Sequence, residues 1–140
     1  CFIDVPSDRW YAPSVNAMAA LGLVSGVGGG RFAPDATMTQ EEFITVLGRL
    51  VEFLNLDAQR YLDERPLGIL QLREEYSAFS TWAIRSADLL MHSVTDENGE
   101  AAAMYCCATL ADIAPKEAIL RGEAAASLCR ALRATGALRY

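Results

Sequence analysis

Apolar residues recur at steps of three and four along one segment in the first half of the chain. Within residues 39–54 they are Phe43, Val46, Leu47, Leu50, Val51 and Leu54. This spacing places them on one face of an α-helix and leaves the charged side chains elsewhere on its surface. Thr39 and Glu42 have the spacing of a capping box, in which hydroxyl and carboxylate each accept a backbone N–H of the first turn. The pattern therefore predicts a helix over residues 39–54.

Other segments with helical spacing flank this one. Residues 13–21 form an apolar run that starts with Pro13, a residue suited to a first helical turn. A second run, WAIRSADLLM, begins at Trp82. A final helix is expected from near Pro115 to about Thr135, with Gly136 as its stop. These segments predict helices on both sides of the central one.

A glycine-rich loop connects the first helix to the second. Gly26 and the run of three glycines from Gly28 to Gly30 supply positions that take positive φ or let backbones pass closely. Phe32 offers an apolar side chain that can close the loop, and Pro34 prevents helix until Thr39. One unit of the chain is therefore helix, loop, helix, with an apolar face left to bury.

The C-terminal half contains a degenerate copy of this unit. Aligning residues 32–34 (FAP) with residues 113–115 (IAP) places Thr39 on Leu120, Gln40 on Arg121 and Glu42 on Glu123 without a gap. Upstream, Trp82 stands for Trp10, and residues 61–63 are a weaker echo of residues 2–4. Because Leu120 has no hydroxyl with which to cap, we expect the last helix to begin elsewhere than at the aligned position.

The second copy has lost the glycine loop. Residues 100–110 are rich in alanine instead, and they predict an extra helix after a turn at residues 98–99. The connecting residues 57–75 contain the turn sequence LDERP and then LGILQLREEY, which predicts a short helix. The fold class is mostly α, with six or so helices in tandem helix-loop-helix repeats that form a small helical bundle. We expect one domain over residues 1–140, made of a first repeat (2–55), a connector (56–75) and a degenerate second repeat (76–136).

Composition narrows the function classes. The 140 residues are 52% apolar, which suits a globular domain, and no apolar run approaches the roughly 20 residues of a membrane span. A net charge of −6, with one lysine and eleven arginines, argues against non-specific attraction to nucleic acid. The chain begins at Cys1 directly before the first motif and without a signal peptide, so we expect a fragment whose export signal lies outside it.

No residue pattern indicates a catalytic or metal centre. Cys106 and Cys107 are adjacent and are interpreted as part of a helix, with a redox role as the alternative, while Cys129 is interpreted as a small core residue facing inward with Leu128 and Leu132. His92 lacks the neighbours of a triad or a metal site. The glycine run lacks the Lys-Ser/Thr of a phosphate-binding loop. We therefore expect no enzyme, cofactor or metal.

Six short motifs in the first unit resemble the S-layer homology (SLH) family of bacterial surface proteins. They are Phe2-Ile3-Asp4-Val5, Trp10, the apolar helix, Gly22-Leu23-Val24-Ser25-Gly26, Gly30-Arg31-Phe32-Ala33-Pro34 and Thr39-Gln40-Glu41-Glu42. The resemblance covers one good repeat, at about residues 2–54, and one degenerate repeat, at about residues 61–135. Gln40 stands where the family usually carries arginine.

The resemblance implies a function and a site. SLH modules anchor surface proteins non-covalently to an anionic secondary cell-wall polymer attached to peptidoglycan, so the expected location is extracellular, at the bacterial cell wall or S-layer. An arginine fork would grip a carboxylate and an aromatic face would stack on a sugar. The glycan-binding residues carried over from the family are Asp4, Trp10, Gly26, Gly30, Gln40, Trp82 and Arg121.

Each candidate residue also has a structural interpretation, and these stay open. The two tryptophans could be packing residues, Asp4 could cap a turn, and Arg121 could pair with a nearby carboxylate such as Glu117. The corresponding alternative for the whole chain is a decayed SLH-derived module that packs or self-associates, as a homodimer, without glycan binding. A third hypothesis is an appended enzyme whose catalytic part lies outside these residues.

Overall fold

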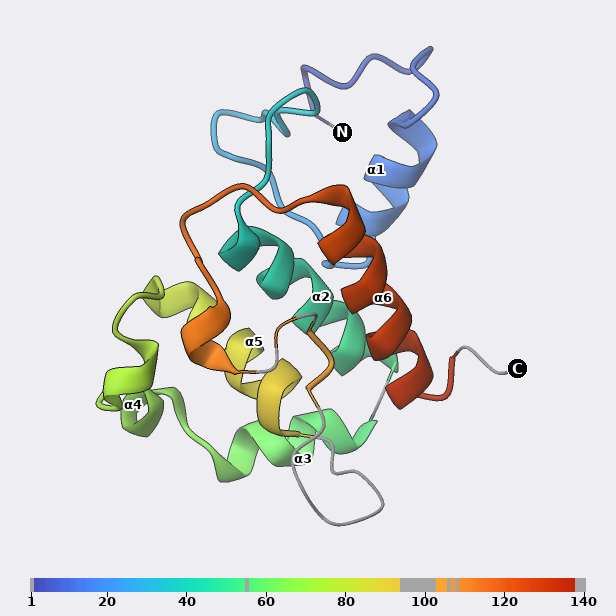
Figure 1. Cartoon of the computed structure of the whole chain (residues 1–140). Helices are drawn as coiled ribbons and strands as arrows, with labels where there is room; N and C mark the ends of the chain where they lie inside the picture. The colour runs from blue at the N-terminus through green and yellow to red at the C-terminus, as the bar shows by residue number, and fades with distance from the viewer. Residues whose placement is uncertain (1, 55, 94–102, 106, 108, 138–140) are drawn as a thin grey trace. The chain divides into compact units, whose positions relative to one another are not determined.

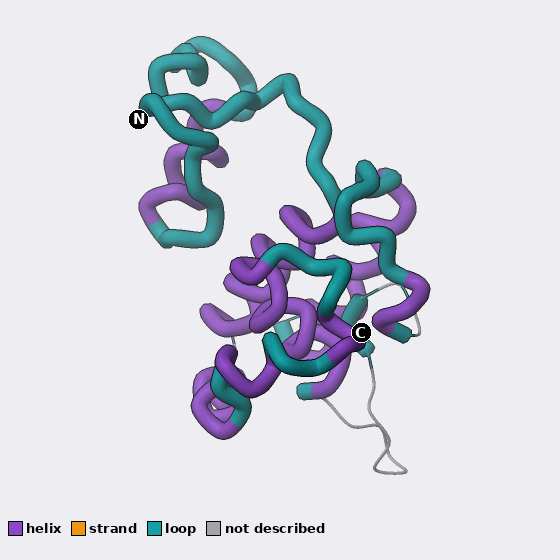
Figure 2. Tube along the Cα trace, turned by 90° about the vertical axis from the view of Figure 1, so that its left-hand side faces the viewer, coloured by secondary structure: helices purple, strands orange, loops and turns teal. Residues whose placement is uncertain are grey.

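The structure is a computed structural model that describes residues 2–54, 56–93, 103–105, 107 and 109–137. It divides into two compact units, Cys1–Thr37 and Met38–Tyr140. The helices are α1 (Ala12–Ala20), α2 (Gln40–Leu54), α3 (Leu56–Glu64), α4 (Leu67–Leu70), α5 (Thr81–His92) and α6 (Arg121–Ala134), with short 3-10 turns at Glu74–Tyr76 and Leu110–Asp112. Helices and loops make up all the described residues, which confirms the predicted mostly α fold (Figures 1 and 2). The division into repeats stays a prediction.

The first unit holds α1 and the glycine-rich loop. Helix α1 begins at Ala12, with Pro13 in its first turn as predicted, and its last turn is closed at Leu21, whose N–H donates to the Ala17 carbonyl. Gly22 follows with a φ of 74°, in the left-handed region where a helix commonly ends on glycine. The predicted helix over residues 13–21 is confirmed.

Helix α2 is central to the second unit. Its start is the predicted capping box: the Thr39 N–H donates to the Glu42 carboxylate at 2.9 Å, and the Glu42 N–H donates to the Thr39 hydroxyl at 3.3 Å. Its apolar face is buried against α5, and α6 lies along another side of it (Figure 1). A Cβ on Gly48 would lie 2.5 Å from the Ser86 Cβ, so the missing side chain is what lets α2 and α5 approach this closely.

The start of α6 differs from the prediction near Pro115. The helix begins at Arg121, and Leu120 is its N-cap, where the backbone N–H donates to the Glu123 carboxylate at 2.9 Å. This is the carboxylate half of a capping box, and it works without a hydroxyl at the cap. The ungapped repeat alignment therefore placed the helix start better than the capping rule did. The predicted end is confirmed, with Thr135 at the C-cap and Gly136 at a φ of 73°.

An antiparallel pairing joins the segments that precede α2 and α6. The Ile119 N–H donates to the Met38 carbonyl at 3.0 Å, and the Gln40 N–H donates to the Glu117 carbonyl at 2.8 Å. Met38 and Ile119 are equivalent positions in the repeat alignment, so the two copies meet at matching points. The segments that lead into α2 and α6 therefore lie side by side.

The helix predicted over residues 100–110 is wrong where the structure describes it. The described residues from 103 to 109 are not helical; the predicted turn at 98–99, the first residues of that helix and Cys106 lie outside the described residues. Met104 and Tyr105 are instead fully buried, and the Met104 N–H donates to the Leu90 carbonyl at 2.7 Å. Arg130 of α6 donates to the Tyr105 carbonyl at 2.7 Å. Burial and these long-range hydrogen bonds override the helix preference of alanine.

Two smaller predictions also need correction. The connector forms α3 before its turn, a helix that the sequence analysis did not predict, whereas the short helix after the turn is confirmed as α4. In α6 the buried residues are Ser127 and Ala131, while Leu128 is 40% exposed and Cys129 is half-buried. The inward face of α6 is therefore one position away from the face predicted through Leu128 and Cys129.

Candidate functional site

The carboxylate of Asp4 closes the glycine-rich loop of the first unit through hydrogen bonds to its backbone. One carboxylate oxygen accepts the Phe32 N–H and the other accepts the Ala33 N–H, both at 2.8 Å. Ala33 has a φ of 61°, a left-handed backbone that costs energy for a residue with a side chain. The hydrogen bond from the Phe32 N–H, with that from Ala33, lowers the pKa of Asp4 although its partial desolvation acts in the opposite direction. Asp4 thus holds the strained end of the loop as a carboxylate.

Gly26 and Gly30 shape the same loop. A Cβ on Gly26 would lie 2.5 Å from the Arg31 carbonyl oxygen and 2.8 Å from the Phe2 ring, so no other residue fits without displacement. Gly30 has a φ of 72°, and its carbonyl accepts the Ile3 N–H at 2.9 Å. The loop is therefore folded back on the first residues of the chain, and its glycines have the positive φ and the close backbone approach that the sequence predicted.

Trp10 presents its side chain to solvent in the first unit. It is 87% exposed, and its ring meets the ring of Tyr11 edge-on, with centroids 5.6 Å apart. An exposed indole offers a flat apolar face with a polar N–H, the combination that stacks on sugars. Asp4, Trp10, Gly26 and Gly30 thus belong to one compact unit, in which Trp10 is the side chain available for contact.

Gln40 and Arg121 open their helices in different surroundings. Gln40 is only 7% exposed, and its side-chain oxygen accepts the Tyr105 hydroxyl at 3.2 Å. Arg121 is exposed and makes no hydrogen bond or ion pair with any residue that the structure describes, Glu117 included. The interpretation of Arg121 as one half of a surface pair is therefore wrong for the described part of the chain. The positive charge of Arg121 is available to a ligand.

A buried carboxylate that the sequence analysis missed lies beside Gln40. The side chain of Glu41 is 5% exposed and accepts hydrogen bonds from the Ser80 N–H and hydroxyl, each at 2.8 Å, and from the Lys116 ammonium at 2.7 Å. Burial by itself raises the pKa of Glu41, but the bonds from Lys116 and Ser80 outweigh it and the pKa is lowered. The cluster ties the start of α2 to the start of α5 and to the segment before α6. No spacing rule in the sequence connects these three residues.

A second buried carboxylate supports α5 from the other side. Asp88 is fully buried and accepts two hydrogen bonds from the Arg65 guanidinium, at 2.6 and 2.8 Å, and one from the Tyr76 hydroxyl at 2.6 Å. Burial, with the hydrogen bond to Asp88, raises the pKa of Tyr76, so its hydroxyl stays protonated and keeps donating. This network fixes α5 on the connector and has all its charge balanced internally, which marks it as structural.

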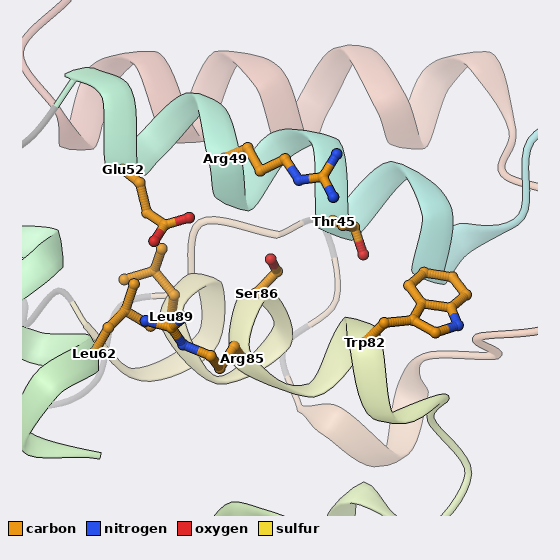
Figure 3. A pocket seen from close by; sticks show the side chains of 8 residues that line it. All are labelled: Thr45, Arg49, Glu52, Leu62, Trp82, Arg85, Ser86 and Leu89. Carbon is orange, nitrogen blue, oxygen red and sulfur yellow. The ribbon is translucent and has the colours of Figure 1, made fainter. Parts of the chain in front are cut away.

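A pocket of about 140 Å³ lies between α2 and α5, within the second unit (Figure 3). Its lining comes from α2, α3 and α5 and consists of Thr45, Arg49, Glu52, Leu62, Trp82, Arg85, Ser86 and Leu89. Trp82 is the one sequence-predicted site residue in this lining, and it is 54% exposed. Arg49 and Arg85 were not predicted as site residues. The spacing of Trp82 and Arg85 on α5 is the signal that could have pointed to a shared face.

Among the residues that the structure describes, no cluster of three or more histidine, cysteine or acidic side chains lies close enough together to hold a metal ion. None of the described helices is long and apolar enough to cross a membrane.

Comparisons with known proteins find a family match and a related surface protein. Residues 2–44 match the S-layer homology domain. A segment of 56 residues, 40% of this chain, is 34% identical to a cell surface protein of Thermoanaerobacter kivui. The chain spans only 7% of the length of that relative. No solved structure matches the chain significantly.

Proposed function

Taking as premise that residues 2–44 of this chain belong to the S-layer homology domain family, we propose that the chain is a non-covalent anchoring module of a bacterial surface protein. Its ligand is an anionic secondary cell-wall polymer attached to peptidoglycan, and its place is outside the cell, at the wall or S-layer. The module binds rather than catalyses. The observation that carries the proposal is the family match over the segment that Asp4 closes into a loop.

Two exposed side chains supply the chemistry of binding in this proposal. Trp10 offers a stacking face at 87% exposure. Arg121 offers a guanidinium without a partner among the described residues, at the first turn of α6. A guanidinium fork matches a carboxylate in shape and charge, and an indole covers the apolar face of a sugar ring. Asp4, Gly26 and Gly30 hold the loop in shape, and Trp82 adds a second aromatic contact.

A specific observation favours one competing function, that of a structural SLH-derived module without glycan binding. The position that carries arginine in the family is Gln40, and its side chain is buried and hydrogen-bonded to Tyr105. A neutral, enclosed side chain contributes nothing to the recognition of an anion. In this second candidate the module associates with another copy of itself.

Retention on purified cell-wall sacculi tests the proposal. Sacculi of the source bacterium and of Thermoanaerobacter kivui are compared before and after hydrofluoric acid extraction of the secondary polymer. We expect the chain to be retained on intact walls and released by extraction, and Arg121→Ala to weaken retention about tenfold. Arg60→Ala is the matched control, since Arg60 is an exposed arginine of α3 that pairs with Glu64 on the same helix.

Each outcome selects a function. Retention that disappears on extraction and weakens with Arg121→Ala supports the anchoring proposal. Absence of retention on intact walls contradicts it and favours the structural module. Dimerisation measured by analytical ultracentrifugation, together with absent retention, would identify that module as the self-associating one.

A further inference from the structure

The pocket between α2 and α5 has two ends of different character (Figure 3). Arg49 extends from α2 towards the end that Thr45 and Trp82 line, while Glu52 lies at the other end, on the side to which Arg85 extends. An anion at the Glu52 end would meet a carboxylate, whereas at the Arg49 end it would meet a guanidinium and hydroxyl groups. The charges of the lining therefore favour a ligand whose anionic group lies beside Arg49 and Trp82.

Ser86 is an unused polar group in the same pocket. The residue is 8% exposed, and its hydroxyl has no hydrogen-bond partner among the described residues. Figure 3 shows this hydroxyl pointing from α5 into the space between the two helices. The hydroxyl of Thr45, opposite, already donates to the Glu41 carbonyl at 2.9 Å and can only accept. Ser86 thus lines the pocket with a hydroxyl that makes no hydrogen bond to a described residue and can donate to a ligand that enters it.

The dimensions suit one six-membered ring. The cavity measures about 140 Å³, close to the roughly 150 Å³ of a cavity that accepts a benzene molecule. The indole of Trp82 forms one wall and is 54% exposed, so a sugar ring stacked on it can continue into solvent as a chain. With a net charge of −6 the chain does not attract anions over long distances, and an anionic ligand must be held by placed groups such as these.

We infer that this pocket binds a single anionic sugar residue of the wall polymer. Its carboxylate or phosphate contacts Arg49 and the Ser86 hydroxyl, its ring stacks on Trp82, and its hydroxyls contact Arg85 and Glu52. The inference rests on the proposed function for the identity of the polymer. It assigns to the second unit a contact separate from Trp10 and Arg121.

Nuclear magnetic resonance of the 140-residue chain tests the pocket directly. The chain has two tryptophans, so each indole N–H gives one resonance, and a Trp82→Phe variant assigns them. The probes are glucuronate, glucose 6-phosphate and neutral glucose. We expect an acidic sugar to shift the Trp82 resonance and leave that of Trp10 unchanged, with an affinity at least about tenfold above that of glucose. A shift with glucuronate alone identifies a carboxylate ligand, and one with glucose 6-phosphate alone identifies a phosphate ligand.

Substitutions in the pocket distinguish a loss of ligand affinity from a loss of folding. Arg49→Gln should reduce the affinity for the acidic sugar about tenfold and leave that for glucose nearly unchanged. Ser86→Ala removes only a hydroxyl that has no partner among the described residues, so the thermal midpoint should hold while the affinity falls several-fold. Arg60→Gln, the same charge change on the exposed face of α3, should have no effect. Equal binding of acidic and neutral sugars, or no Trp82 shift with any probe, overturns the inference.

Wall binding by the same variants distinguishes this inference from the function on which it rests. Retention of the unaltered chain on polymer-bearing sacculi, with Arg49→Gln and Ser86→Ala retained equally well, would overturn the pocket and leave the anchoring proposal standing. Weaker retention of both variants supports the pocket. A chain that is not retained at all contradicts the anchoring proposal, whatever the Trp82 resonance does.

Discussion

The first turns of α2 and α6 occupy equivalent positions in the two copies, yet their side chains have opposite surroundings. In α2 the turn is buried: Gln40 contacts Tyr105, and Glu41 contacts Ser80 and Lys116. In α6 the equivalent positions are an exposed Arg121 and Gly122, which has no side chain. Packing interactions are concentrated in the first copy, while the free positive charge lies in the second. In the proposed site, the degenerate repeat therefore supplies the exposed arginine that the better copy lacks.

The largest expected effect on stability comes from the buried first turn of α2. Glu41→Gln removes a charged acceptor from three donors, and we expect it to lower the free energy of unfolding of the second unit by about 2 kcal/mol. Most of the loss comes from the Ser80 bonds, since Lys116 is 61% exposed and its ion pair is screened by solvent. Urea denaturation followed by circular dichroism measures it. Glu117→Gln, an exposed carboxylate next to Lys116, is the control and should change little.

Acid should remove the same stabilisation in the unaltered protein. The pKa of Glu41 is lower in the folded chain than its ordinary value, so the unfolded state binds more protons between the two values. Stability is consequently highest above the ordinary carboxylate pKa and falls as the pH decreases through the folded one. Thermal midpoints recorded from neutral to acidic pH should fall more steeply for the unaltered chain than for Glu41→Gln. Parallel curves would contradict the role given to Glu41.

The Thr39 cap of α2 should contribute less to the free energy of unfolding than the buried cluster around Glu41. Thr39→Ala removes the hydroxyl that accepts the Glu42 N–H, and we expect a loss of about 1 kcal/mol. The Glu42 carboxylate still accepts the N–H of residue 39, so half of the capping box remains. Urea unfolding of Thr39→Ala beside the unaltered chain gives the difference. A loss as large as that of Glu41→Gln would mean that the cap, rather than the cluster, fixes this helix start.

The smallest expected effect on stability comes from giving α6 the capping hydroxyl that α2 has at Thr39. Leu120→Thr supplies the hydroxyl that the second capping box lacks, at a site that is 67% exposed and loses little packing. We expect a gain of about 0.5 kcal/mol in the free energy of unfolding. The reverse control is Leu120→Ala, which adds no acceptor and should not stabilise. Equal midpoints for both variants would indicate that the Glu123 carboxylate alone satisfies this helix start.

The elements that the sequence predicted well are those governed by local rules. Helix α2 has both an apolar face and a capping box, and α1 has proline in its first turn, so their bounds followed from neighbouring residues. The start of α6 did not, because the Glu123 carboxylate caps it without help from Leu120. Residues 103–105 have helix-forming composition but are fixed by burial and by bonds to Leu90 and Arg130, which lie far away in sequence.

The residues of the candidate site also differ in whether the local sequence could predict their roles. The roles of Gly26 and Gly30 in the loop could be inferred from residue type. The hydrogen bonds that Asp4 accepts from Phe32 and Ala33 could not, because the sequence suggested only that Asp4 caps a turn and these partners lie far away in sequence. The part of all three residues in glycan binding stays a prediction. The pocket of Arg49, Trp82 and Ser86 could not be predicted, because it exists only where Gly48 lets α2 approach α5. The buried Glu41 cluster likewise joins three segments that no local pattern connects. Long-range packing, rather than local preference, created both.

Titration of the chain with purified secondary cell-wall polymer in a calorimeter tests the anchoring function most directly. The polymer is used intact and after chemical removal of its acidic substituents. We predict binding to the intact polymer and a loss of at least about tenfold in affinity once the acidic groups are gone, because arginine side chains provide the recognition. Equal affinity for both forms, or no heat with the intact polymer, would contradict an anchor that recognises an anionic glycan.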